Sequence, residues 1–349
     1  MPNFPTVPSI ARDEVAERLE ASRAAGQLVV ICDIDETAWL DRKGVTSAAA
    51  SLAAELLEIE PEHEAMDLAA RFYRHAEAIR DEWARSTERR ELARLLDVAH
   101  IGTAEILSLD GDDFGPTHPD LRIGARELLT HAANLRRQAW HHAVRSLYPT
   151  AGLGDPVIED LAVGFPHRRR EADHRLVAPG FVDLLRSLWQ REVPIGFLTN
   201  GLWTSQNPKF EAVRHHAATV APEVDWEHVL RDEVRQMSGN LGLAKPQPAT
   251  LRLAVEAAAG GCLEDPATTV VMYGDNPERD GRVALNLHRQ LDLSGRTHGT
   301  VLFGFYDPFP VMPARRLDLA VEERTVRFHS HRAAAAHLGA PRRADAIVR

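Results

Sequence analysis

Residues 28–32, Leu-Val-Val-Ile-Cys, form a continuous apolar run that is as long as one β-strand. A strand that is apolar on both faces has to be covered on both sides, and such strands are typical of parallel sheets that lie between two layers of helices. Comparable apolar runs follow at 193–198, 269–273 and 300–305. The run at 28–32 therefore predicts that the chain folds around a parallel sheet.

Helical patterns alternate with these apolar runs. Strands and helices that alternate in this way predict an α/β fold, here a Rossmann-like three-layer core with a parallel sheet. A short strand is also expected to begin at 229–230, and the tail at 321–349 is expected to be a surface helix or partly disordered. The helices of the core are expected at 9–25, 179–190, 207–218, 248–259 and 280–290.

The character of the sequence changes between the first and second apolar runs. Ala, Leu, Glu and Arg dominate and β-branched residues are few, which favours helices. We therefore predict a Rossmann-like core formed by 1–40 and 175–349, and an inserted, mostly α-helical cap domain formed by 41–174. Within the insertion, helices are expected at 47–59, 62–85, 87–108 and 119–147, and a less regular stretch at 151–177.

Charge and composition exclude several classes of function. The formal net charge is −10, so the chain lacks a basic surface for nucleic acid, and a site for phosphate would have to be locally positive. Two cysteines provide neither a disulfide framework nor a CxxC zinc site. We find no signal peptide and no apolar run of the ~20 residues that a membrane span needs. We predict a cytoplasmic protein with no nucleic-acid or membrane partner.

Lysine is scarce in this chain. Of the 41 Lys and Arg residues only three are Lys, at positions 43, 209 and 245. Coding bias accounts for such a skew, but it makes each lysine a rare choice over arginine. An ammonium is a compact point charge, whereas a guanidinium is a planar fork, so each lysine has to be considered for a task that arginine cannot perform.

Two carboxylates follow the first apolar run directly, in the loop Asp33-Ile34-Asp35-Glu36-Thr37. Ligands of parallel sheets bind outside the carboxyl ends of the strands, which is where this loop would lie. Asp33 could then attack a phosphorus atom, while Asp35 could protonate the leaving oxygen and later deprotonate a water molecule. A solvated acidic turn is the alternative interpretation of the same residues.

Polar residues follow two more segments of the predicted core. Thr199 and Asn200 end the run at 193–198, where a hydroxyl and exposed backbone N–H groups could hold phosphate oxygens. Lys245 stands before a helix that starts with proline, and its ammonium could lie between a phosphate and an aspartate. Taken alone, an ordinary strand exit is the better explanation of Thr199 and Asn200, and a single lysine usually lies on the surface, although the scarcity of lysine in this chain favours a function for Lys245 somewhat more.

Acidic residues also follow the apolar run at 269–273. Gly274 and Asp275 come directly after it, and Asp280 lies five residues further on. Magnesium prefers oxygen ligands and keeps several waters, so the carboxylates of Asp33 and Asp275 with the carbonyl of Asp35 could bind Mg²⁺. A capped helix start is the alternative, because Asp and Asn are favoured helix caps.

The order and spacing of these features resemble the haloacid dehalogenase-like hydrolase superfamily. The resemblance covers about residues 26–40 and 178–306, and the segment between them lies where that family inserts a helical cap. Four motifs carry it: a strand followed by DxDxT, a strand followed by Thr, a Lys before a helix, and a strand followed by GD and another acid. They are matched here by Asp33, Asp35 and Thr37, by Thr199, by Lys245, and by Asp275 and Asp280.

The resemblance implies a role for each matched residue. It implies that Asp33 forms an aspartyl-phosphate and that Asp35 is the general acid and base. Thr199 and Lys245, with the adjoining Asn200, would hold the phosphoryl group. The implied magnesium ligands are Asp33, the Asp35 carbonyl and Asp275, with Asp280 supporting the metal shell and Thr37 steadying the loop.

The motif variant narrows the reaction within the superfamily. Its dehalogenases lack the second aspartate, its phosphonate-cleaving members need a cap lysine, and its ion pumps carry Thr at the position of Asp35. The resemblance therefore implies a magnesium-dependent phosphatase acting on a small phosphorylated metabolite. A phosphomutase or phosphotransferase with the same motifs, and a non-catalytic phosphate-binding member, remain as alternatives.

Several weaker features favour structural interpretations. Adjacent histidines such as His141 and His142 do not face each other on a helix, so solvated side chains are expected. Arg168, Arg169 and Arg170 are expected to form a solvated charge run. Trp39, just past the acidic loop, could either contact substrate or pack at the start of the insertion. Cys32 would point to the opposite side of its strand from Asp33 and is expected to have no chemical role.

Overall fold

The structure, a computed structural model, describes residues 12–86, 102–109, 119–170, 176–307 and 319–339. Its centre is a six-stranded sheet in the order β3-β2-β1-β4-β5-β6, in which every neighbouring pair is parallel. The predicted α/β fold with a Rossmann-like core is therefore confirmed. The strands are β1 (Leu28–Cys32), β2 (Ile195–Thr199), β3 (Arg235–Met237), β4 (Thr269–Gly274), β5 (Thr300–Tyr306) and β6 (Thr325–Phe328).

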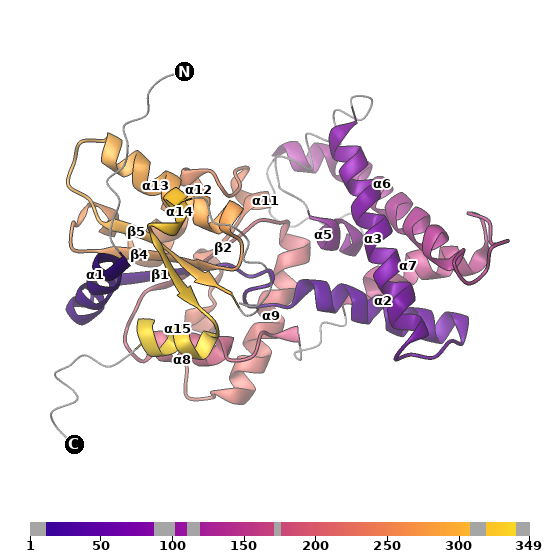
Figure 1. Cartoon of the computed structure of the whole chain (residues 1–349), viewed down its shortest axis with the longest axis horizontal. Helices are drawn as coiled ribbons and strands as arrows, with labels where there is room; N and C mark the ends of the chain where they lie inside the picture. The colour runs from indigo at the N-terminus through magenta and orange to yellow at the C-terminus, as the bar shows by residue number, and fades with distance from the viewer. Residues whose placement is uncertain (1–11, 87–101, 110–118, 171–175, 308–318, 340–349) are drawn as a thin grey trace.

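Two layers of helices cover the sheet (Figure 1). In β1, Val30 and Cys32 pack into a hydrophobic cluster with α1, α8, α9 and α15, while Val29 and Ile31 pack into another with α12 and α13. Successive side chains of a strand point to opposite faces, so an all-apolar strand packs against both helical layers. The covering helices are α1 (Arg12–Ala25), α8 (Phe181–Trp189), α9 (Trp203–Val220), α12 (Pro248–Ala259), α13 (Arg282–Leu293) and α15 (His331–Leu338).

The strand register brings three loops to one edge of the sheet. Cys32, at the end of β1, pairs with Phe197 in β2 and with Tyr273 in β4. The chain therefore leaves β1, β2 and β4 at nearly the same height. Short elements fill the remaining connections: α10 (Trp226–Val229), α11 (Ser238–Leu241), α14 (Leu319–Glu322), the 3₁₀ turns Asp232–Val234 and Cys262–Glu264, and the π turn Pro277–Gly281.

The chain between β1 and α8 forms a separate group of helices, which lies to one side of the sheet in Figure 1. We call α2 to α7 the helical segment. It has a hydrophobic cluster of its own, in which the rings of Phe72 and Trp140 stack with centroids 4.1 Å apart. Its helices are α2 (Asp41–Leu57), α3 (Glu64–Arg85), α5 (Thr103–Ser108), α6 (Pro119–Val144) and α7 (Pro156–Arg170).

A short two-stranded contact joins the helical segment to the sheet. The N–H of Leu40 donates to the carbonyl of Leu176 at 2.8 Å, and the N–H of Ala178 donates to the carbonyl of Ala38 at 2.8 Å. Trp39, between these bonds, has no exposed surface. Of the two roles considered for Trp39, packing at the start of the insertion is the one that this position supports.

Some expected elements are wrong. Residues 229–230 end α10 rather than begin a strand, and the strand beyond them, β3, was missed because Arg235–Met237 is only three residues long and two of the three are polar. The stretch expected to be irregular contains α7, whose Ile158, Leu161 and Phe165 are buried at helical spacing despite an interior proline. The tail contains a strand that was not expected, β6, before the helix α15, and residues 340–349 lie outside the described part of the chain.

Two other expectations reach residues that the structure leaves undescribed. The helix expected at 87–108 is described only over Thr103–Ser108, and the predicted return to the core at 174 falls within 171–175, outside the described residues. The predicted domain boundaries therefore stay predictions. In the part of the chain that is described, none of the helices is both long and apolar enough to cross a bilayer.

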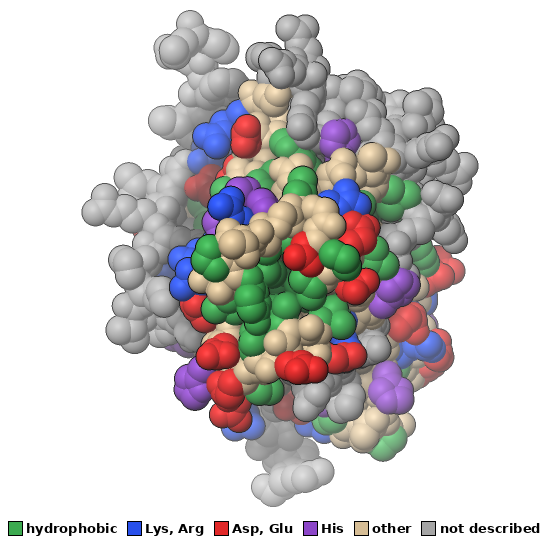
Figure 2. Space-filling view, turned by 90° about the vertical axis from the view of Figure 1, so that its right-hand side faces the viewer, with side chains coloured by type: hydrophobic (Ala, Val, Ile, Leu, Met, Phe, Trp, Pro, Cys, Tyr) green, Lys and Arg blue, Asp and Glu red, His purple; other side chains and the backbone are tan. Residues whose placement is uncertain are grey.

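The face of the helical segment turned away from the sheet carries hydrophobic side chains among acidic ones (Figure 2). Large apolar side chains are exposed around α6 and α7, namely Leu147, Tyr148, Leu153 and Val163. Isolated surface hydrophobes are common in soluble proteins. This face lies at the opposite end of the helical segment from the contact with the core.

Candidate active site

Asp33 begins the loop that leaves the central strand. Its backbone N–H donates to the carbonyl of Tyr273 at 2.8 Å, which continues the pairing of β1 with β4 by one residue. The residue is 5% exposed, and its Oδ1 lies 2.6 Å from Nζ of Lys245. The parallel ladder thus fixes the main chain of Asp33, and a buried cation fixes its side chain.

Lys245 joins two carboxylates that come from different strand ends. Its Nζ lies 2.6 Å from Oδ1 of Asp33 and 2.6 Å from Oδ1 of Asp280, and its side chain is 2% exposed. Burial opposes the charged ammonium, but the two carboxylates outweigh it and raise the pKa of Lys245. Lys245 is therefore a permanent positive charge beside Asp33.

Asn200 fixes the position of this lysine. Its Oδ1 accepts from the backbone N–H of Lys245 at 2.9 Å, and its Nδ2 donates to the backbone carbonyl of Lys245 at 3.2 Å. The predicted phosphate-binding role of Asn200 is untested, and its side chain is committed to the main chain of Lys245. An amide that makes both bonds orients the lysine that reaches Asp33.

The π turn Pro277–Gly281 holds Asp280 in place after β4. The turn begins at Asn276, whose side chain accepts from the N–H groups of Glu278 and Arg279. Asp280 is fully buried, and its Oδ2 accepts from the N–H of Asn276 at 3.1 Å. A Cβ atom on Gly274 would overlap that carboxylate, so only glycine allows this approach.

Three carboxylates from these two strand ends could hold a metal ion. Ligand oxygens of Asp33, Asp275 and Asp280 all lie within 4.8 Å of one another, and Oγ1 of Thr37 donates to Oδ1 of Asp275 at 3.4 Å. An all-oxygen donor set at partly buried carboxylates fits Mg²⁺, which is a hard cation. Both oxygens of Asp280 already have protein partners, Lys245 and Asn276, which suits a supporting role.

Burial and the neighbouring charges have opposing effects on the pKa of Asp33. Burial, which is the largest effect, and the neighbouring Asp280 carboxylate raise the pKa of Asp33 to about 6, against the lowering effect of Lys245. A cation beside a carboxylate favours its ionised form. A further positive charge next to Asp33 would therefore stabilise its ionised carboxylate.

Asp35 is partly exposed and contacts a different cation. Its side chain is 31% exposed, its Oδ2 accepts from Nε2 of Gln206 at 2.9 Å, and its Oδ1 pairs with Nζ of Lys209. Burial raises the pKa of Asp35 even though the Lys209 ammonium lowers it. Asp33 and Asp35 are thus neighbours in sequence with separate electrostatic partners.

Thr199 is connected to Asp35 through a glutamine. Its Oγ1 lies 3.4 Å from Oε1 of Gln206, whose Nε2 donates to Asp35. Thr199 is 1% exposed and is the last residue of β2, as predicted for a residue at the carboxyl edge of the sheet. The structure brings Thr199 and Lys245 to the same edge as Asp33, because Asn200 links the end of β2 to Lys245.

Sequence reasoning missed four residues that surround Asp35, namely Asp41, Arg169, Gln206 and Lys209. Oδ1 of Asp41 accepts from Nη2 of Arg169 at 2.5 Å and lies 3.0 Å from Nζ of Lys209. The expectation that Arg169 is solvated is wrong: its side chain is 6% exposed. The scarcity of lysine was a signal for Lys209, whereas nothing local distinguishes Arg169 from the arginines beside it.

A second group of possible metal ligands lies on α13 and in the segment that follows it. Ligand atoms of His288, Asp292 and His298 lie within 4.8 Å of one another. Burial and then the nearby Arg324 guanidinium lower the pKa of His288 to about 4. The same guanidinium would oppose a divalent cation, so these residues do not favour a metal centre.

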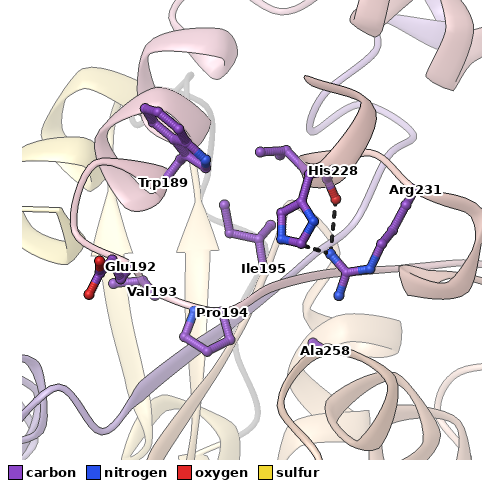
Figure 3. A pocket seen from close by; sticks show the side chains of 9 residues that line it. Trp189, Glu192, Val193, Pro194, Ile195, His228, Arg231 and Ala258 are labelled. Carbon is purple, nitrogen blue, oxygen red and sulfur yellow. Dashed lines mark hydrogen bonds between the residues drawn. The ribbon is translucent and has the colours of Figure 1, made fainter. Parts of the chain in front are cut away.

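A pocket lies near the amino end of β2, at the opposite end of the strand from Thr199 (Figure 3). It is lined by Pro194 and Ile195 at the start of β2, and by Trp189, His228 and Arg231, with Nη1 of Arg231 donating to the carbonyl of His228 at 2.9 Å. Active sites of parallel sheets lie at the carboxyl ends of the strands. This pocket is therefore separate from the group around Asp33.

The family comparison agrees with this fold. A family model described as haloacid dehalogenase-like hydrolase matches residues 28–288, which include every predicted site residue. The chain is similar to a crystal structure of 2-haloacid dehalogenase from Pseudomonas syringae pv. Tomato DC3000, with 18% identity, a TM-score of 0.40 and coverage of 89% of this chain and 97% of that chain. It is also similar to the magnesium-bound HAD-hydrolase YfnB from Bacillus subtilis, with 12% identity, a TM-score of 0.44 and the same coverages, 89% and 97%. The comparison with curated proteins gives no match.

Proposed function

Because the chain belongs to the haloacid dehalogenase-like hydrolase family, we propose that it is a magnesium-dependent phosphatase that acts on a small phosphorylated metabolite through Asp33. The observation that carries the proposal is the placement of two aspartates with different partners. Lys245 holds Asp33 inside the site, whereas Asp35 is partly exposed beside it. A nucleophile and a separate acid and base are what a two-step transfer of a phosphoryl group requires.

The proposed reaction has two steps at these side chains. The Asp33 carboxylate attacks phosphorus, the bond from phosphorus to the leaving oxygen breaks, and the proton of Asp35 goes to that oxygen. Asp35 then takes a proton from a water molecule, which attacks the same phosphorus and releases inorganic phosphate and the free Asp33 carboxylate. Lys245 stays charged through both steps and opposes the negative charge of the transferring group.

Magnesium would be held by the carboxylates of Asp33 and Asp275 and by the carbonyl of Asp35, with Asp280 supporting it through water. The ion would supply positive charge next to the phosphoryl oxygens. Thr199 and Lys245 would hold those oxygens from the side of β2. Asn200 would contribute through its hold on Lys245.

The helical segment would act as a cap, with 41–174 as the inserted domain and 1–40 with 175–349 as the catalytic core. A cap of this size closes over a site and excludes water and large substrates. That favours a small metabolite over a phosphorylated protein. Asp35 favours phosphoryl transfer over dehalogenation, because a halide ion leaves without a proton.

Release of phosphate from a panel of phosphorylated metabolites, with Mg²⁺ present, tests this function. We expect turnover that is lost on addition of a chelator, on Asp33→Asn and on Asp35→Asn. Asp265→Asn is the matched control, because Asp265 is exposed at the amino end of β4. Transfer of the phosphoryl group to another hydroxyl group without phosphate release would indicate a phosphomutase or phosphotransferase, and release of halide from a haloacid would indicate a dehalogenase. A panel without any turnover would indicate a binding protein.

A further inference from the structure

The two ends of the helical segment meet beside Asp35. Asp41 is the first residue of α2, where the chain enters the segment, and Arg169 is the second-last residue of α7, where the chain leaves it. Their side chains form an ion pair, and they are 10% and 6% exposed, respectively. A single buried contact therefore links both connections between the segment and the core.

Lys209 connects this ion pair to the acidic loop. It comes from α9, a helix of the core, and its Nζ pairs with both Oδ1 of Asp41 and Oδ1 of Asp35. Its side chain is 7% exposed, and the two carboxylates raise its pKa against the effect of burial. The series Arg169, Asp41, Lys209 and Asp35 thus alternates in charge from the helical segment to the loop of the nucleophile.

Two further contacts shape this series. The guanidinium of Arg169 lies over the ring of Trp39, 5.9 Å from its centroid, and Trp39 pairs with Asp35 as an isolated β-bridge. A Cβ atom on Gly44 would come within 2.8 Å of Nη1 of Arg169, so glycine leaves room for the guanidinium against α2. Arg169 therefore contacts Trp39 and Asp41, just past the acidic loop, through packing and through charge respectively.

We infer that Lys209, Asp41 and Arg169 are positioning residues that couple the docking of the helical segment to the orientation of Asp35. When the segment is docked, Asp41 shares the ammonium of Lys209 with Asp35 and limits how tightly that ammonium holds Asp35. When the segment moves away, Lys209 is left with Asp35 as its carboxylate partner in this series. The inference rests on the proposed function, in which Asp35 is the acid and base.

Because the Arg169–Asp41 pair is buried, the coupling should depend strongly on each of its two members. The loss of one member of a buried ion pair leaves the other charge without compensation, which is strongly unfavourable. An exposed pair has little effect of this kind, because water screens it. The helical segment offers an exposed counterpart: Arg168 on α7 pairs with Glu55 on α2, and Glu55 is 59% exposed. The same two helices are therefore joined by one buried pair near Asp35 and one exposed pair away from it.

Substrates with different leaving groups separate positioning from simple stability. An alkyl phosphate needs protonation of its leaving oxygen, whereas an acyl phosphate leaves without it. We expect Arg169→Gln and Lys209→Met to reduce the rate of phosphoenzyme formation from an alkyl phosphate by about 10²-fold, which is the order of one acid–base contribution. The rate from acetyl phosphate should change by less than about threefold, and Arg168→Gln should leave both rates unchanged. Equal losses on both substrates would overturn the inference.

Combined variants test whether these residues act through Asp35. Residues that act as one unit are not additive, so Arg169→Gln should have no further effect in the Asp35→Asn background. Arg169→Lys should restore part of the rate on the alkyl phosphate, because it keeps the charge. Additive losses in Asp35→Asn/Arg169→Gln would contradict the coupling.

Hydrogen exchange separates the failure of the inference from the failure of the proposed function. The amides of Thr37, Ala38 and Trp39 donate to the carbonyl of Ile34. We expect faster exchange at these amides in Arg169→Gln and Lys209→Met than in wild type or Arg168→Gln. Faster exchange in a protein that hydrolyses no phosphate ester would contradict the proposed phosphatase function and still support the coupling. Unchanged exchange would contradict the coupling, whether or not the protein is active.

Discussion

At the scale of single residues, the account depends on how closely buried charges approach. Lys245 lies 2.6 Å from both Asp33 and Asp280, and Asp280 fits under β4 because residue 274 has no side chain. Such contacts leave no room for an additional methyl group. The exact identity of the small residue at 274 therefore matters as much as that of the acids.

Gly274→Ala tests this packing. Its Cβ would displace the Asp280 carboxylate and with it the ammonium of Lys245. We expect a loss of stability of about 1–3 kcal/mol, which is typical of overpacking, together with a loss of phosphate release. Gly102→Ala is the control, because no atom lies within 4 Å of its added Cβ. A Gly274→Ala protein with wild-type stability and activity would show that Asp280 is not held as described.

His331 predicts how stability depends on pH. It is fully buried between Tyr273 and Tyr306, and burial lowers its pKa from 6.5 to about 4. The folded protein therefore keeps this imidazole neutral, while the unfolded chain binds a proton below pH 6.5. The contribution of His331 is fully present above pH 6.5 and is lost as the pH falls towards 4. The shift corresponds to about 3 kcal/mol at most.

Denaturant unfolding at several pH values checks this sign. Between pH 6.5 and pH 5 we expect wild type to lose about 2 kcal/mol more of its unfolding free energy than His331→Gln does. His63→Gln, at an exposed position of the helical segment, should follow the wild-type curve. A His331→Gln curve parallel to wild type would mean that His331 binds its proton with the same pKa in the folded protein as in the unfolded chain.

At the scale of elements, the helical segment rests on a core of its own. Phe72 is fully buried in α3 and stacks on Trp140 of α6. Phe72→Ala should therefore cost about 3–5 kcal/mol without moving Asp33 or Lys245. We expect a lower unfolding midpoint for the helical segment by circular dichroism, and Met66→Ala, at an exposed position of α3, should have no effect. An unchanged midpoint in Phe72→Ala would contradict a separate core.

Continuous apolar runs made the main strands predictable. β1, β2, β4 and β5 are buried on both faces, so burial alone selects their composition. β3 and β6 lie at the edges of the sheet, where one side is open and polar residues are tolerated, and both were missed. The helix α7 was missed because Pro166 masked the helical spacing of its apolar residues.

The motif residues were predictable for a similar reason, since each directly follows or precedes a predicted element. Asp33 and Asp275 directly follow strands, Thr199 is the last residue of a strand, and Lys245 precedes a helix. The partners of Asp35 were not predictable in this way. Arg169 and Asp41 are 128 positions apart and meet through the fold of the helical segment, which no local pattern records.

At the scale of the whole molecule, two units share one site. The strand ends of the sheet supply the proposed nucleophile, the lysine and the carboxylates, and the helical segment is joined to the sheet next to Asp35 through Trp39 and the Asp41–Arg169 pair. The proposed catalytic residues thus lie next to the contact between the segment and the sheet. Substrate size and chemistry at this place would be set by the segment rather than by the sheet.

The most direct test of the account is the phosphorylation of Asp33 itself. The protein would be mixed with Mg²⁺ and acetyl phosphate, quenched in acid within milliseconds, digested and examined by mass spectrometry. We expect one added phosphoryl group on the peptide that contains Asp33, accumulating in Asp35→Asn and absent from Asp33→Asn. Turnover without any phosphopeptide, or a phosphoryl group on a different residue, would contradict the central claim.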